Sequence, residues 1–92
     1  MYKYTIARQL ATKRVITNRG DEVGKLLDLL VDEVSGEIEF LLVEVDRDSK
    51  LIKRLSPKER IIQVPYSAVT AVSDVFIVDE RELATAPEIA AQ

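Results

Sequence analysis

The residues at positions 23–45 read VGKLLDLLVDEVSGEIEFLLVEV and contain two apolar runs separated by Ser35-Gly36. The first run, 23–33, would also suit one face of a helix, but Gly24 opens it and Ser35-Gly36 closes it, which favours a strand. The second run, 38–45, is a strand by its alternation and its aliphatic content. Two strands around a glycine-containing turn predict a β-hairpin.

Both strands of this hairpin are apolar on two faces. In 38–45, Leu41 and Val43 share one face, whereas Phe40 and Leu42 share the other. A small barrel has its core on one side only, so large apolar residues should lie outside it. The lead-in turn or the C-terminal tail could cover them, but a protein–protein surface is the sharper interpretation, with a homodimer as its simplest form. We expect this interface to contain Leu27, Leu29, Phe40, Leu42 and, on similar grounds, Phe76.

The rest of the chain adds short β-branched segments at 14–18, 60–65, 67–72 and 74–78. Residues 18–21 have turn chemistry, and Gly20 can adopt a positive φ. The segment 46–59 is charged and contains Pro57, so we expect a loop. Five or six short strands without a long helix predict an all-β fold, a small six-stranded barrel over residues 1–79 that begins with a short N-terminal turn. Residues 80–92 are expected to form a tail that is mobile or becomes ordered in an assembly.

The composition excludes several kinds of chemistry. The 92 residues include no Cys, His or Trp, so a disulfide, a Cys/His zinc site, a cysteine nucleophile and imidazole acid–base catalysis are all excluded. We therefore expect no enzyme, no cofactor and no metal. The longest apolar runs are far shorter than the ~20 residues that span a bilayer, and no signal-peptide pattern is present. A cytoplasmic protein is the expectation.

The charges are distributed unevenly along the chain. Residues 47–60 hold six cations against two acids, a net +4, which leaves −7 for the remainder of a chain whose net charge is −3. Such asymmetry can mark a surface for nucleic acid or for an acidic protein segment. Nucleic acid is disfavoured because the segment lacks an aromatic residue on which bases could stack. The candidate patch consists of Lys50, Lys53, Arg54, Lys58 and Arg60.

Asp28 interrupts the first apolar run. A catalytic role lacks an evident acid–base partner, so a structural role is favoured. If Asp28 lies among apolar neighbours, backbone amides should hydrogen-bond its carboxylate, because a buried and unsatisfied carboxylate is costly.

The spacing of these features resembles the PRC-barrel domain family. The resemblance is carried by Val15-Ile16-Thr17, the stretch from Gly20 to Leu26, the hairpin, and Ile62-Gln63-Val64-Pro65-Tyr66 with the run 74–78. It implies a six-stranded barrel used for protein interaction. Stand-alone members of this length resemble archaeal proteins, some of them similar to the B-type cell-division proteins.

Those B-type proteins dimerise and join the membrane-anchored adaptor SepF to the FtsZ ring. The resemblance thus implies a non-enzymatic adaptor that pairs with itself or with a paralogous PRC-barrel protein. It also implies that the protein contacts the membrane only through a partner, near the division site. The alternative is an RNA- or ribosome-associated maturation factor that uses the basic segment 47–60.

Overall fold

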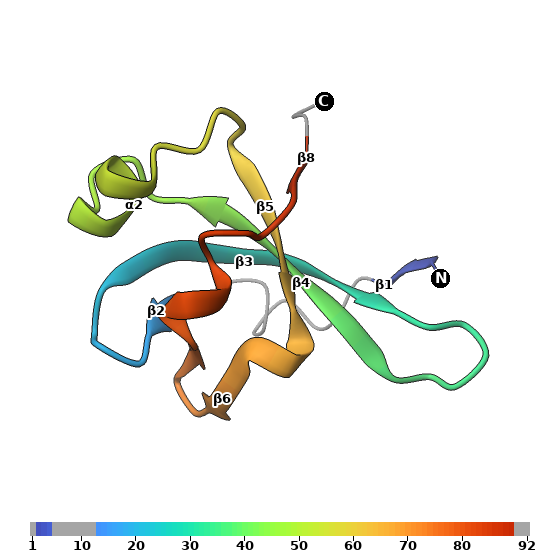
Figure 1. Ribbon diagram of the computed structural model, residues 1–92. Helices are drawn as coiled ribbons and strands as arrows, with labels where there is room; N and C mark the ends of the chain where they lie inside the picture. Colours follow the sequence, from blue (N-terminus) through green and yellow to red (C-terminus); the bar gives the residue numbers. More distant parts are fainter. Residues whose placement is uncertain (1, 5–12, 90–92) are drawn as a thin grey trace.

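The computed structural model describes residues 2–4 and 13–89, which form one twisted sheet with short helices beside it (Figure 1). The strands are β1 (Tyr2–Tyr4), β2 (Arg14–Thr17), β3 (Glu22–Val31), β4 (Ile38–Val45), β5 (Ile61–Pro65), β6 (Val69–Val72), β7 (Val75–Val78) and β8 (Glu88–Ile89). The helices are α2 (Lys50–Leu55) and two 3₁₀ turns, η1 (Tyr66–Ala68) and η2 (Glu80–Glu82).

The sheet has the strand order β6-β7-β2-β3-β4-β5-β8, and β1 pairs with β3 off this path. All pairs are antiparallel except β2 with β7, which run parallel. The predicted all-β class is confirmed. The structure has eight strands where six were expected, and within residues 2–4 and 13–89 no pairing joins β6 to β8, so the sheet is open along this path.

The predicted hairpin is present as β3 and β4, which project beyond the rest of the sheet (Figure 1). Its turn depends on Gly36, whose φ of 76° lies in the left-handed region that glycine adopts without strain. The Asp32 carboxylate accepts hydrogen bonds from the amides of Val34 (2.8 Å) and Ser35 (3.2 Å). The turn is therefore held by the local hydrogen bonding for which Asp is suited.

A β-bulge at Leu27 changes which face of β3 points inward. Leu26 is opposite Val43, but beyond the bulge Leu29 is opposite Leu41. Val43 and Leu41 are both fully buried, so Leu26 and Leu29 also face the core although they are three positions apart. One extra residue thus reverses the alternation of the strand.

The core is a single cluster between the inner face of β3, β4 and β5 and the strands β2 and β7. Residues outside the strands also add to it: Ala68 of η1, Leu83 after η2, and Leu51 and Ile52 of α2. The buried members are Val15, Val23, Leu26, Leu29, Leu41, Val43, Val45, Leu51, Ile52, Ile62, Val64, Ala68, Phe76, Val78 and Leu83.

The prediction of a loop over 46–59 was wrong in part, because 50–55 form α2. Leu51 and Ile52 are buried, and Leu55 packs against the core, so the helix has one apolar face. The Ser49 hydroxyl donates to the Glu22 carbonyl at 2.6 Å, which ties the start of α2 to the start of β3. Ser56, at a φ of 51°, ends the helix in the left-handed conformation.

The interpretation of 80–92 as a tail was also wrong for 80–89. Leu83 is buried in the core, and β8 pairs with the edge of β5. The reason is that β5 would otherwise leave its outer edge unpaired, and the segment after η2 returns to it. The expected short N-terminal turn, which the sequence places at residues 6–11, and the last residues 90–92 lie outside the described part of the chain.

Gly24 sits where β2, β3 and β4 meet, opposite both Val15 and Val45. A Cβ placed on Gly24 would lie 1.9 Å from the backbone oxygen of Glu44, a distance that only a shift of β4 could relieve. We expect Gly24→Ala to lower the free energy of unfolding by about 3 kcal/mol or more. Urea denaturation followed by circular dichroism measures this.

The matched control is Gly20→Ala. Gly20 also has a special conformation, with φ 86°, but a Cβ there meets nothing within 4 Å. Gly20→Ala should therefore lower the free energy of unfolding by only ~1 kcal/mol, the cost of a left-handed backbone conformation for alanine. Equal losses in the two variants would contradict the close approach of β3 to β4.

The hydrogen bonds to Asp32 should make stability depend on pH. The amides of Val34 and Ser35 lower the pKa of Asp32 below its ordinary value of 3.8. Stabilisation by a depressed carboxyl is complete above the unfolded pKa and is lost as the pH falls through the folded pKa. Below about pH 4, the melting temperature of Asp32→Ala should therefore fall less steeply than that of the parent chain. Parallel curves from pH 7 to pH 2 would refute the role of Asp32.

Candidate protein-interaction surface

The side of β3, β4 and β5 that faces away from the core is called the outer face here. The strand register places Leu30, Phe40 and Pro65 in one row across it. All three are half-buried, in contrast to the fully buried Leu41 on the inner side. The outer face therefore carries an apolar row on a sheet whose core lies on the opposite side.

The next row of the outer face contains Asp28, Leu42 and Gln63. Leu42 is half-buried, and Asp28 is buried beside it. The amide of Leu29 donates to the Asp28 carboxylate at 2.8 Å, as expected for a carboxylate among apolar neighbours. Leu27, the bulge residue, is 38% exposed. Phe40, Leu42 and Leu27 are thus accessible at least in part.

Two of the predicted interface residues are in the core, and their assignment to a partner surface was wrong. Leu29 is 2% exposed because the bulge at Leu27 turns it inward against Leu41. Phe76 is 4% exposed because the parallel pairing of β7 with β2 sets it beside the buried Val15. The alternation of apolar and polar residues along a single strand reveals neither a bulge nor a parallel pairing between strands that are distant in the sequence.

Beyond these rows the outer face becomes charged. Lys25 is opposite Glu44, and the Glu44 carboxylate lies 3.3 Å from Arg60. Arg14 and Glu22 form a second ion pair at 2.7 Å, which raises the pKa of the Arg14 guanidinium. A groove of about 430 Å³ runs between these charges, over Gly24. Because cations and acids alternate around it, the groove has no overall preference for an anion or a cation.

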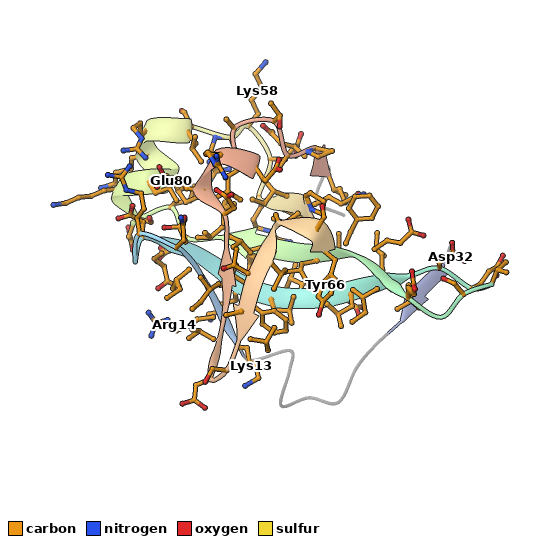
Figure 2. The ribbon with its side chains drawn as sticks, turned by 60° about the horizontal axis from the view of Figure 1, so that its bottom comes forward. Lys13, Arg14, Asp32, Lys58, Tyr66 and Glu80 are labelled. Carbon is orange, nitrogen blue, oxygen red and sulfur yellow. The ribbon has the colours of Figure 1, made fainter. Side chains whose placement is uncertain are left out.

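The five cations of the predicted basic patch are not equally available. Arg54 lies 3.5 Å from Glu80, and Arg60 lies 3.3 Å from Glu44. Lys50 and Lys53 are exposed on α2, and Lys58 projects from the turn before β5 (Figure 2). Acids from η2 and β4 therefore offset part of the +4 charge of this segment.

The described residues hold no group of three or more potential metal ligands, and none of their helices is long and apolar enough to cross a membrane. Several of the contacts that sequence reasoning missed involve Arg47 or the segment 80–89. Ser49 before Leu51 and Ile52 was a usable signal for α2. No comparable signal marks Glu88, whose partners are backbone amides.

These features define a small all-β domain that presents an apolar face on the outside of its sheet. The PRC-barrel domain model matches residues 6–84, which is most of the chain, and the chain belongs to this family. A protein of Methanocaldococcus jannaschii described as uncharacterized is similar, with 32% identity over 77 residues that cover 84% of this chain and 83% of the relative. The match extends past position 79, in agreement with the buried Leu83.

The inward turn of Leu29 can be tested against its neighbour Leu30. Leu29→Ala removes a fully enclosed side chain and should cost about 2–5 kcal/mol of unfolding free energy. Leu30→Ala, on the half-buried outer face, should cost less than half of that. Chemical denaturation of both variants measures the two free energies of unfolding. A larger loss in Leu30→Ala than in Leu29→Ala would show that the assignment of the inner and outer faces is reversed.

Proposed function

We propose that this chain is a non-enzymatic protein-interaction module that binds through the outer face of β3–β5. The observation that carries the proposal is the apolar row of Leu30, Phe40 and Pro65 with Leu42 beside it, opposite a complete core. Half-buried apolar side chains on a sheet face gain about 25 cal/mol for each Å² that a partner covers. The charged rim around Glu44 and Lys25 would then orient the partner.

The partner that suits this face best is a second PRC-barrel domain, either an identical copy or a paralogue. A specific interface buries about 600–1,000 Å² on each side. The chain exposes 5890 Å² in total, so the contact would cover roughly a tenth to a sixth of its surface. In a two-fold symmetric dimer the apolar row of one copy packs against the same row of the other copy, so one surface serves both partners.

The cellular role proposed here is that of a cytoplasmic adaptor in archaeal cell division. Such a dimer would link SepF to the FtsZ ring and reach the membrane only through SepF. Support comes from the resemblance in sequence and from the archaeal source of the similar protein. A role with RNA or the ribosome has less support, because Arg54 and Arg60 are already paired with acids.

The test is the double variant Phe40→Asp/Leu42→Asp. Two carboxylates in the apolar row should prevent association without touching the core, so the expected result is a folded monomer. Light scattering after gel filtration gives the mass, and circular dichroism reports the fold.

The matched control is Val34→Asp, because Val34 is 92% exposed at the hairpin tip and outside the outer face. This variant should remain dimeric. A double variant that is folded and still dimeric would refute the outer face as the interface, and an unfolded one would show that Phe40 and Leu42 belong to the core.

A further inference from the structure

The turn at Pro57–Arg60, between α2 and β5, is held from two sides. The Arg47 guanidinium donates to the carbonyls of Pro57 and Glu59. From the other side, one oxygen of the Glu88 carboxylate accepts from the amides of Lys58 (3.0 Å) and Glu59 (2.9 Å). Two successive amides that converge on one carboxylate oxygen form an anion-binding turn, and here the anion comes from the C-terminal segment of the same chain.

Among the described residues, the segment that carries Glu88 is attached to the sheet by few backbone contacts. In the described part of the chain, which ends at residue 89, β8 has two residues, with Ile89 opposite Ile61 and Glu88 opposite Ile62. One further backbone bond runs from the Gln63 amide to the Pro87 carbonyl at 2.8 Å. β5 is five residues long, so β8 pairs with only part of the edge that is available. Short elements of this kind open locally far more often than a core strand.

The packing under this segment is incomplete. A cavity of about 60 Å³ remains between α2, β5 and the chain after Leu83. Ile52, Leu55, Pro57 and Ile62 line it on one side, and the C-terminal segment lines it with Leu83, the small side chains of Ala84 and Ala86, and Glu88. A segment with a larger apolar residue in place of Ala86 would fill this space better.

We propose that the edge of β5 together with the Lys58 and Glu59 amides is a binding site for an extended acidic segment of a partner protein. In the free chain residues 86–89 occupy this site as an internal strap. The chemistry of the occupant follows from the strap itself: a carboxylate for the two amides, backbone groups for the β5 edge, and an apolar residue two positions before the carboxylate.

Charge favours the same occupant. Lys58 itself is exposed, and Lys53 is exposed on the neighbouring helix. Both would attract an acidic segment and repel a basic one. Addition of a strand to a free edge supplies affinity through the main chain, while the carboxylate supplies specificity. This site consists of backbone groups at the edge of β5 and in the turn before it, whereas the outer face consists of side chains, and it does not depend on dimer formation.

The first experiment measures whether the strap opens. Glu88→Ala removes the carboxylate, so hydrogen exchange at the Lys58, Glu59 and Gln63 amides should become at least ten times faster. The amide of Val43, within the sheet, should be unchanged. Glu82→Ala is the matched control, because Glu82 is an exposed acid of the same segment. Unchanged exchange at Lys58 and Glu59 would overturn the proposal.

The second experiment supplies the segment from outside. The probe is a fluorescently labelled peptide of residues 84–92. Its binding is measured by fluorescence polarisation as the full chain is added. It should bind the Glu88→Ala chain at least ten times more tightly than the parent chain, whose strap competes. Replacement of the glutamate by glutamine in the peptide should weaken binding at least tenfold, and leucine in place of Ala86 should strengthen it.

Three results would overturn the assignment. Equal binding of the glutamate and glutamine peptides, or no binding at millimolar concentration, would show that the amides do not select an acidic segment. A concentration-dependent dimer of Glu88→Ala that excludes the peptide would assign the site to the strap of a second copy.

Discussion

The register of β3 against β4 is the constraint on which the other parts of this domain depend. Leu26 pairs with Val43 and Leu29 with Leu41, and the residue inserted between the two pairs allows both leucines to face the core. A strand of ten residues without that insertion would bury alternate residues along one face and expose Leu29. The bulge therefore enlarges the core and at the same time leaves Leu30 and Phe40 to form the outer face.

Much of the fold follows from local chemistry. The hairpin, the turns at Gly20 and Gly36, and the strands that contain Val15 and Val78 were predicted from β-branched runs and turn residues. Three of the five predicted surface residues, Leu27, Phe40 and Leu42, are accessible at least in part, and Phe40 and Leu42 do alternate with core residues. These features need only the neighbouring residues in the chain.

The errors arose where distant parts of the chain decide the outcome. Leu29 turns inward because β4 fixes the register, and Phe76 turns inward because β7 lies beside β2. α2 was missed because its six residues hold too short a pattern to outweigh the charges around it. The segment 80–89 was read as a tail because the partners of Glu88 are backbone groups, which leave no trace in composition.

The parallel pairing of β2 with β7 also governs how the chain can reach its fold. Arg14 is opposite Val75, and the Lys13 ammonium reaches the Ser73 carbonyl, 60 residues away. A contact between such distant residues forms late, because the intervening chain must first be brought into a closed loop. During synthesis, β2 therefore stays unpaired on one edge until residue 78 has left the ribosome. In this unpaired state of the nascent chain, Val15 and Ile16 are not yet covered by β7. The chain is therefore most prone to aggregation during this interval.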